Sequence, residues 1–593
     1  MMRSGVRQGC PISPLLFILA LEPALRRIQN LEKGYKIHNH RIDVLAYADD
    51  IALVSESAQG LQDQLNSIST WADWAGFHFN IQKCATLSVA GKAHCTGPEH
   101  FTLNHDRIPN LREDESYRHL GVPTGFTKCD TEDATFDSII SVVSKLDASK
   151  LAPWQKVDAL NTFVTPKLSF CFITGTNPKK QLNKIDKTVK RCVKRWLGLP
   201  QRASAEVVVL PYQQGGANVT PSSALADIAQ ICHATHIFHS RDQAIREIAW
   251  KFLKAVTESR IRRTPNINDT CKYLDGSVDG EFGTEPTDIS SMWTRLRMAS
   301  RRLRKKLSIS WIPGDNNLPV ITAKELPVKA RDCQRTLCCL LKESYLHKLL
   351  SKPDQGKVYG VTARHAACNH FLNNGHYTSF ADWRFVHRAR LSVVALRGHK
   401  RFGNETKKCR RCSFFRETLS HVLCHCPSNF RMITRRHNAI LERLVKAFQK
   451  KDAMVLVNQR IPGYKVNCRP DLVIIHEPTK TATIVDVTTP FENGQPAFEA
   501  AREEKVTKYS GLVHHFRERG YDTHISAFVV GALGGYDPQN EATLQRLGIG
   551  RKYASLMRKL MVSDSIRWSN DIYRQHLGDY NRSAAIAPAP QRQ

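Results

Sequence analysis

Residues 44–54 read VLAYADDIALV, two short apolar runs on either side of adjacent aspartates. Apolar runs of this length around a turn-forming pair are typical of a β-hairpin, which would hold Asp49 and Asp50 at its tip. Exposed carboxylates on a rigid hairpin can bind the two divalent ions that phosphoryl transfer to a 3′-hydroxyl requires. Asp-rich hairpin turns are also common without chemistry, so the surrounding sequence has to decide.

Three further motifs surround this hairpin in a fixed order: GVRQGCPISP at residues 5–14, GFHFNIQKC at 76–84 and YRHLGV at 117–122. Residues 1–125 mix short apolar runs with helical stretches such as residues 61–77, which predicts an α+β domain. Taken together, the four motifs resemble the palm of non-LTR retrotransposon reverse transcriptases.

That resemblance implies roles for individual residues. Gln8 and Gly9 would contact the incoming nucleotide or template, and Leu120 and Gly121 would grip the primer. A magnesium ion would be bound by Asp49 with support from Asp50, and Lys83 would protonate the leaving pyrophosphate. The family's first catalytic aspartate precedes the first of these motifs and is absent from this chain. We therefore expect a piece of a longer polyprotein that does not polymerise alone.

The composition predicts a nucleic-acid partner. The 593 residues include 86 Lys and Arg against 55 Asp and Glu, a formal charge of +31. Such a charge attracts polyanions through phosphate contacts and counterion release. No apolar stretch approaches ~18 residues and no signal peptide is evident, so we expect a soluble intracellular protein without a membrane partner. The 17 cysteines are scattered apart from one cluster, which favours reduced thiols and a metal site.

The middle of the chain is predicted to be mostly helical. Residues 126–260 form a thumb-like region, in which one helical face carries Lys187, Lys190, Arg191, Lys194 and Arg195 opposite an apolar face. This stripe is either a nucleic-acid-binding face or simply a solvated one. Residues 261–400 are interpreted as a linker, at about 262–290, followed by a basic helix, a second break at 311–327 and a helical His-rich region.

A zinc knuckle is predicted at residues 401–440 by the spacing Cys409-x2-Cys412-x8-His421-x4-Cys426. Thiolates and imidazole in two close pairs suit tetrahedral Zn²⁺, which would also stabilise so polar a segment. Cys424 offers an alternative to Cys426. The flanking Lys407, Lys408, Arg410 and Arg411 indicate nucleic-acid contact.

A second metal site is predicted from RPDLVII at 469–475 and TIVDVT at 483–488. These segments form a hairpin with an acid on each arm, so Asp471 and Asp486 could bind Mg²⁺ that activates water against a phosphodiester. The pattern is that of restriction-enzyme-like nucleases. Those enzymes usually place a lysine two residues after the second acid, where this chain has Thr488.

The lysine could instead come from a helix at 496–519. Its apolar face contains Phe498, Ala501, Tyr509, Leu512 and Phe516, with Lys505 near the centre and Lys508 towards the edge. The ammonium of Lys505 would then point at the two carboxylates, unless its stem merely runs along the apolar face to water. Lys508 and Glu492 are reserve candidates.

The order Arg-Pro-Asp, Asp-Val-Thr, Lys-x2-Lys-Tyr and VGALGGYDP at 530–538 is similar to the C-terminal endonuclease of R-two type elements, which insert into ribosomal RNA genes. The resemblance implies nuclear target-primed reverse transcription: the nuclease nicks DNA and the new 3′-hydroxyl primes copying of the element's RNA. Its partners would be element RNA, genomic target DNA, deoxynucleoside triphosphates and, potentially, a second protomer, with Mg²⁺ at both catalytic sites and structural Zn²⁺.

The expected fold is therefore a multidomain α+β chain: a partial palm, a helical thumb and linker region, a zinc knuckle, a restriction-endonuclease-like α/β domain at 441–580 and a disordered tail at 581–593. Two alternatives remain. One is an inactive nucleic-acid-binding remnant of such an element, since mobile elements decay. The other is a splicing-type maturase, which shares the palm but lacks this combination of a zinc knuckle and a terminal two-aspartate hairpin.

Overall fold

The computed structural model describes residues 9–90, 93–94, 100–126, 133–175, 177–283, 289–399, 406–448, 453–464 and 466–578. Contacts divide the chain into two compact units, each built from separate stretches of sequence. Unit 1 comprises residues 1–137, 168–182 and 223–337, and unit 2 comprises 138–167, 183–222 and 338–593. Among the described helices none is both long enough and apolar enough to cross a membrane.

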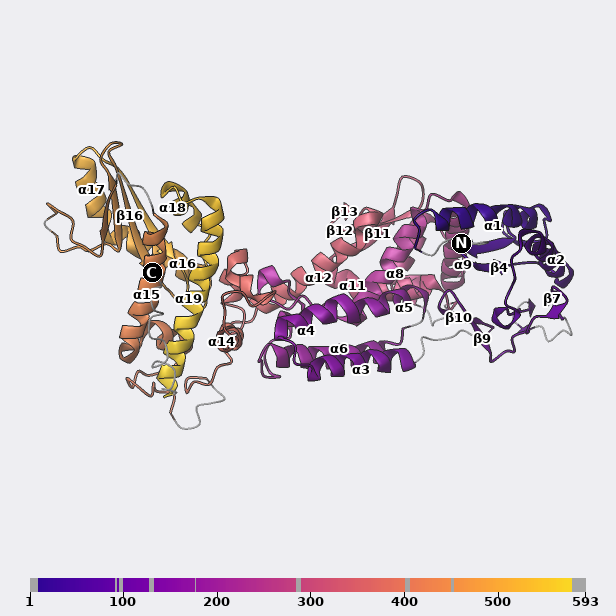
Figure 1. Ribbon diagram of the computed structural model, residues 1–593, viewed down its shortest axis with the longest axis horizontal. Coiled ribbons are helices and arrows are strands. Elements are labelled where there is room, and N and C mark those ends of the chain that lie inside the picture. Colours follow the sequence, from indigo (N-terminus) through magenta and orange to yellow (C-terminus); the bar gives the residue numbers. More distant parts are fainter. Residues whose placement is uncertain are drawn as a thin grey trace, which may run out of the picture. The chain divides into compact units, whose positions relative to one another are not determined.

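The N-terminal part of unit 1 is the α+β region (Figure 1). It consists of helices α1 (Ser13–Asn30) and α2 (Ala58–Ala75) and five antiparallel hairpins. The hairpins pair β1 (Tyr35–Ile37) with β2 (His40–Ile42), β3 (Val44–Tyr47) with β4 (Asp50–Leu53), β5 (Val89–Ala90) with β6 (Ala93–His94), β7 (Thr102–Leu103) with β8 (Asp106–Arg107), and β9 (Ser116–His119) with β10 (Val122–Gly125).

Helix α2 is delimited by its own sequence. The Ser57 side chain accepts a hydrogen bond from the Gly60 amide at the start, and Gly76 ends the helix at φ 71°, a conformation that favours glycine. Its buried face joins α1 and the strands in a core of Ile28, Leu65, Ile68, Phe101, Leu103 and Ile108. Val44, Ile51 and Leu53 of the β3–β4 hairpin pack against this core, which therefore supports the hairpin.

In the remainder of unit 1, the linker predicted at residues 262–290 is wrong, because part of this stretch is helical. Residues 267–274 form helix α10 (Ile267–Leu274), which begins with a reciprocal cap between Asn266 and Asp269. Arg297, a member of the predicted basic helix, is buried and donates hydrogen bonds to the carbonyl oxygens of Tyr273 and Ser277. Residues 284–288 lie outside the described part of the chain.

The second predicted break is also wrong, because residues 309–327 form a three-stranded antiparallel sheet of β11 (Ile309–Pro313), β12 (Pro319–Ala323) and β13 (Leu326–Pro327). The other helices of this part are α5 (Ser169–Thr174), α8 (Ser222–Phe238), α9 (Gln243–Ile261) and α11 (Met292–Leu307), of which α11 contacts β11. The unit limits fall within α3 (Asp133–Ala148), α6 (Lys179–Trp196) and α12 (Cys333–Leu350), and directly after the first residue of α8.

Unit 2 contains a four-stranded sheet in the order β14 (Met454–Val457), β15 (Leu472–His476), β16 (Thr481–Thr488), β17 (Asp522–Val529). The first three strands are antiparallel, whereas β17 runs parallel to β16. The connection between these parallel strands carries α16 (Gln495–Lys508) and α17 (Ser510–Glu518). A mixed α/β sheet is therefore present where the sequence predicted one.

The predicted continuous helix at 496–519 is broken at Tyr509, whose backbone leaves the helical conformation at φ −107° and ψ 11°. The break lets the Tyr509 ring insert into the core while α17 packs on the sheet through Leu512, Val513 and Phe516.

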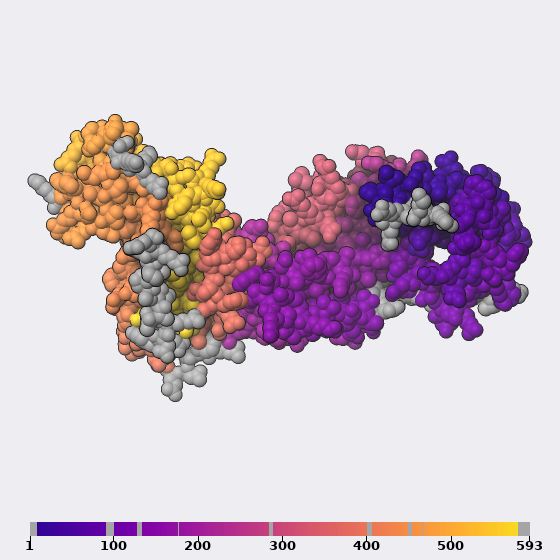
Figure 2. All heavy atoms as spheres, viewed as in Figure 1, coloured from indigo at the N-terminus to yellow at the C-terminus, as the bar shows by residue number. Residues whose placement is uncertain are grey.

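The other helices of unit 2 are α4 (Pro153–Ala159), α7 (Glu206–Val209), α13 (Tyr359–Thr362), α14 (Phe380–Arg390), α15 (Phe430–Ala447), α18 (Asn540–Arg546) and α19 (Arg551–Leu577). Helices α15 and α19 lie side by side, and α15 also contacts β16. In Figure 2 the orange sheet segment and the yellow C-terminal helices pack against one another. The predicted tail at 581–593 lies outside the described residues.

Candidate functional site

The Tyr47-Ala48-Asp49-Asp50 tetrad lies at the tip of a hairpin, as its sequence predicts. Tyr47 pairs with Asp50 across β3 and β4, and Ala48 adopts the left-handed conformation at φ 53° in the turn. Both aspartates are exposed. The arrangement presents two adjacent carboxylates to solvent, where they could bind divalent ions.

The other predicted polymerase residues are dispersed over three turns. Leu120 and Gly121 form the β9–β10 turn with φ values of 47° and 78°, and Lys83 ends a 3-10 turn, where its carbonyl accepts a hydrogen bond from Tyr117. Gly9 is exposed at φ 87°, and Gln8 lies outside the described residues. No hydrogen bond or ion pair among the described residues joins Lys83 to the Asp49–Asp50 turn.

The predicted cationic face of α6 needs one correction. Lys187, Lys190, Arg191 and Arg195 are exposed, but Lys194 is only 4% exposed. Its ammonium donates hydrogen bonds to the carbonyl oxygens of Gln201 at 2.8 Å and Ala203 at 2.5 Å. Burial, with the nearby charge of Lys190, lowers the pKa of Lys194. Lys194 therefore fixes the loop after α6 and is not available to a phosphate.

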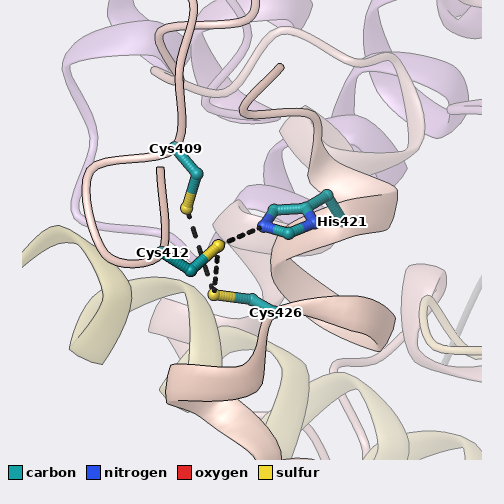
Figure 3. Close-up of side chains that lie close together, drawn as sticks. All are labelled: Cys409, Cys412, His421 and Cys426. Atoms are coloured by element: carbon teal, nitrogen blue, oxygen red, sulfur yellow. Dashed lines mark hydrogen bonds between the residues drawn. The ribbon is translucent and has the colours of Figure 1, made fainter. Parts of the chain in front are cut away.

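The four predicted zinc ligands converge (Figure 3). Cys412 Sγ lies 3.2 Å from His421 Nε2 and 3.8 Å from Cys426 Sγ, and Cys409 Sγ lies 4.0 Å from Cys426 Sγ. Three sulfurs and an imidazole nitrogen at these separations form a donor set that fits tetrahedral Zn²⁺. Burial lowers the pKa of His421, which keeps its imidazole in the neutral, metal-binding form.

Cys424, the alternative ligand, points elsewhere. Its sulfur contacts the Thr489 carbonyl at 3.7 Å and the Arg436 guanidinium at 3.8 Å. Among the described residues, Cys424 belongs to no group of side chains that could hold a metal ion. The pairing of His421 with Cys426 is the one that the geometry supports.

A buried polar network attaches the knuckle to α19. Glu417 and His576 are both fully buried, with 3.0 Å between Glu417 Oε1 and His576 Nε2. Burial opposes ionisation of Glu417, but hydrogen bonds from the Arg410 side chain, the Arg397 and Arg410 amides and His576 lower its pKa to about 2. His576 Nε2 also lies 3.7 Å from Cys409 Sγ, and Arg411 caps the C-terminal carbonyls of α19. The knuckle is thus part of the same packed body as the sheet's supporting helices.

Asp471 and Asp486 stand on neighbouring strands. Leu472 pairs with Val485, so extending the antiparallel register by one residue places Asp471 opposite Asp486. Asp486 is 2% exposed and Asp471 9%. Asp471 Oδ2 accepts a hydrogen bond from the Val487 amide at 2.7 Å. Two buried carboxylates beside each other need a cation, and oxygen donors of this kind suit Mg²⁺.

Lys505 supplies one such cation. Its Nζ forms an ion pair with Asp486 Oδ2 at 2.8 Å. Burial opposes the charged form, but Asp486, with a further contribution from Asp471, raises the pKa of Lys505 above its usual range. Lys508 is exposed and lies over the Tyr509 ring. Of the two lysines, Lys505 is the one that contacts the Asp486 carboxylate.

Glu492, the other reserve candidate, has a structural position. It is fully buried, and its Oε1 accepts hydrogen bonds from the amides of Leu533 and Gly535. A Cβ at Gly531 or Gly535 would lie within 2.9 Å of Glu492 atoms, which explains why the VGALGGYDP segment needs glycine there. Glu492 therefore anchors this loop and makes no described contact with Asp471 or Asp486.

The sequence interpretation missed His437 on α15. Its Nε2 lies 3.0 Å from Asp471 Oδ2 and 3.1 Å from the Val487 carbonyl oxygen. Burial opposes protonation, but hydrogen bonding and charge from Asp471 raise the pKa of His437. A histidine that precedes the hairpin by more than thirty residues has no local signal, although Arg-Arg-His-Asn at 435–438 is an unusually polar stretch for a packed helix.

Comparisons with known proteins agree with the motifs. Residues 2–134 match the family described as reverse transcriptase (RNA-dependent DNA polymerase), and residues 228–393 match the T26G10.4 domain. The type-2 retrotransposable element R2DM polyprotein of Drosophila melanogaster is 30% identical over 85% of this chain and 42% of its own length. A type-1 R2 polyprotein of Popillia japonica is 22% identical over 99% of this chain and 86% of its own length.

An uncharacterized protein of Caenorhabditis elegans, T26G10.4, is 26% identical over 54% of this chain and 95% of its own length. The resemblance to R2 retrotransposon polyproteins is thus confirmed over most of the chain, at 22–30% identity. The chain spans about two fifths of the first two relatives, 42% and 39% of their lengths.

Proposed function

We propose that this chain, an R2-like polyprotein segment, combines the reverse-transcriptase region of such an element with a Mg²⁺-dependent DNA endonuclease in unit 2. The observation that carries the nuclease is the convergence of Asp471, Asp486 and Lys505 on one end of the four-stranded sheet. Buried carboxylates paired with a lysine are a frequent sign of a catalytic site.

In the proposed nuclease, Asp471 and Asp486 would hold Mg²⁺, whose chemistry is to activate water for attack on a phosphodiester. The Val487 amide fixes the Asp471 carboxylate, so this group needs little reorganisation. Lys505 would stay protonated at neutral pH because its pKa is raised, and its ammonium would stabilise the charge that develops on the phosphate.

We further propose that the nick made by this site primes reverse transcription of the element RNA in the nucleus, with Asp49 and Asp50 serving the polymerase. Support comes from the match of residues 2–134 to reverse transcriptases and from the similarity to R2 polyproteins. The partners in this reaction would be element RNA, genomic target DNA, deoxynucleoside triphosphates and a second protomer. Exposed cations on α6, Lys187, Lys190, Arg191 and Arg195, would line part of the nucleic-acid path.

The knuckle is proposed to bind Zn²⁺ through Cys409, Cys412, His421 and Cys426. Lys407, Lys408 and Arg411 are exposed beside it, and Arg411 also caps α19. Phe415 is exposed by 71% and could stack on a base. These features favour a nucleic-acid contact next to the nuclease.

Nicking of supercoiled plasmid DNA at low salt with Mg²⁺ tests the proposal. We expect the full chain to convert plasmid to open circles and Asp486→Asn to lose this activity. Asp522→Asn, which removes an exposed acid at the start of β17, is the matched control and should nick normally. Plasmid binding without nicking by the parent would instead support the inactive nucleic-acid-binding remnant.

A further inference from the structure

A cavity of about 380 Å³ lies in unit 1 and is lined by residues of α5, α8, α11 and the segment between α5 and α6. Its volume falls within the range of small-molecule sites, ~300–1,000 Å³. The apolar part of its wall consists of Phe172, Pro178, Ala226 and Met298. All of the lining residues belong to unit 1, whereas the proposed nuclease and the zinc knuckle belong to unit 2.

The cavity has more positive than negative charge. Lys179, Arg295 and Arg302 line it, and Asp227 is the one acid that lines it within the described part of the chain. Lys179 Nζ lies 2.7 Å from Asp227 Oδ1, and Arg302 Nε donates a hydrogen bond to Asp227 Oδ2 at 3.0 Å. A single buried carboxylate is thus shared by two cations, and the third cation is left without an acid.

That third cation is Arg295. Its side chain forms no hydrogen bond or ion pair with the described residues, and its Nε is buried without a partner. Burial lowers the pKa of Arg295, and burial together with the charge of Arg295 lowers the pKa of the nearby His233. An unneutralised guanidinium with a buried N–H is costly, so an anionic ligand would gain an ion pair and a charge-assisted hydrogen bond there.

A second unsatisfied atom belongs to Asn177, which lines the same cavity. The Asn177 amide nitrogen donates hydrogen bonds to the carbonyl oxygens of Cys171 at 2.7 Å and Gly175 at 3.2 Å, which orient the amide group. Asn177 Oδ1 is buried and has no hydrogen-bond partner among the described residues. A ligand that suits this cavity therefore offers an N–H donor as well as a negative charge.

We propose that this cavity binds one unpaired nucleotide, with its phosphate at Arg295 and its base against the apolar part of the wall. Helix α11 begins after the Ser291 cap, and Ser291 and Thr294 line the cavity, so the positive end of the helix dipole also favours the phosphate. The base supplies an N–H to Asn177 Oδ1 and stacks on apolar side chains, as unpaired bases do in proteins that bind single strands. The ligand class is a nucleoside phosphate, either free or within a strand.

Nucleotide binding by the full chain tests the proposal. Calorimetry with 5′-AMP, at physiological ionic strength and without Mg²⁺, should show saturable binding that Arg295→Gln weakens about tenfold or more, because a charge-assisted hydrogen bond is lost. Arg301→Gln is the matched control, since Arg301 is exposed on the same helix and does not line the cavity. Absence of saturable binding, or equal weakening in both variants, would overturn the proposal.

Met298→Glu tests the cavity without changing Arg295. Met298 lines the cavity and is 41% exposed, so the substitution should leave the chain folded, which thermal unfolding checks. Its carboxylate should repel the phosphate and weaken AMP binding about tenfold, whereas Met298→Gln should bind AMP within about twofold of the parent. AMP binding that Met298→Glu leaves unchanged would contradict the assignment to this cavity.

Competition experiments identify the source of the nucleotide. Displacement of AMP by a single-stranded RNA oligonucleotide, but not by its duplex, assigns the cavity to an unpaired nucleotide of a strand. AMP binding that resists the oligonucleotide assigns it to a free nucleotide. Inorganic phosphate that binds as tightly as AMP would show a plain anion site and overturn the role of the base. These measurements do not involve nicking, so their outcome is independent of the nuclease proposal.

Discussion

The ammonium of Lys505 lies on an otherwise apolar helix face that includes Phe498 and Tyr509. We expect Lys505→Gln to lower plasmid nicking by about 10²–10³-fold, because removal of one preorganised charge-stabilising group typically costs that much. Lys508→Gln, an exposed neighbour with the same charge change, should keep nicking within about twofold. Single-turnover nicking rates at saturating Mg²⁺ provide the measurement, and equal losses in both variants would contradict the assignment.

At this scale, sequence periodicity located the side chains whose environment is local. The apolar stripe around Lys505 follows from helix geometry alone, and the Cys and His spacing of the knuckle identified residues that converge in space. Periodicity placed Lys194 on the cationic face because helix geometry carries no information about the next loop, whose carbonyl oxygens accept the hydrogen bonds of this ammonium. His437 was missed, and Glu492 was named only as a reserve nuclease residue, for the same reason: their partners are distant in sequence.

At the scale of elements, the residue directly after α10, Asp275, is a titratable group that joins this helix to β11. Burial raises the pKa of Asp275 at the end of α10 to about 6, although its Oδ1 accepts a hydrogen bond from the Trp311 amide. Because the pKa of Asp275 is higher in the folded state than its ordinary 3.8, its protonation stabilises the folded state. This contribution is fully present below pH 3.8 and is lost as the pH rises through about 6.

Asp275→Asn removes this titration and keeps an oxygen for the Trp311 amide. We expect the variant to be more stable than the parent at pH 8, by up to about 3 kcal/mol for two pKa units, and to lose the advantage near pH 4. Thermal unfolding at the two pH values measures the difference. A gain that is the same at both pH values would show that the charge of Asp275 is not its cause.

Helices α14 and α19 border a cleft of about 210 Å³ whose lining includes Arg384, Arg388 and Arg574. No ion pair is found for these three arginines within the described residues, so they can contact phosphates. Changing all three to Gln should weaken DNA binding and reduce the slope of log affinity against log salt by about 2–3. Fluorescence anisotropy with a duplex oligonucleotide measures both quantities.

The control for that experiment removes the same charge from exposed residues elsewhere in unit 2, Arg546, Arg551 and Lys552. It should change the slope by less than one. A control that matches the triple variant would mean that overall charge, and not the cleft, governs binding.

Element prediction failed where tertiary contacts stabilise a segment of weak periodicity. The stretch at 262–290 contains glycines and acids, yet α10 forms because Asn266 and Asp269 cap it and the buried guanidinium of Arg297 satisfies the carbonyls after it. The sequence interpretation predicted neither the cap nor the role of Arg297, because a charged helix is ordinarily assigned to the surface.

For the whole molecule, the order of motifs predicted a palm region before a knuckle and a knuckle before a two-aspartate sheet, and the structure contains the α+β region, the Cys/His cluster and the sheet in that order. The domain boundaries that we expect from the sequence remain predictions. Each compact unit collects separate stretches of chain, and residues 183–222 belong to the unit of residues 338–593. Such long-range association depends on packing between elements, which local sequence patterns do not encode.

Zinc should couple the knuckle to the rest of unit 2, because Cys409 lies 3.7 Å from His576 on α19, and α19 packs along α15, the helix of His437. We expect Cys412→Ser to lose zinc, to unfold at a lower temperature and to lose nicking even with Mg²⁺ present, since metal binding contributes directly to folding free energy. Cys424→Ala is the matched control, because its sulfur contacts Thr489 and Arg436 and, among the described residues, belongs to no metal-binding group. It should keep its full zinc content by mass spectrometry and its nicking activity. If Cys412→Ser loses zinc but nicks normally, the knuckle is an independent module and the buried Glu417–His576 network does not transmit its stability to the nuclease.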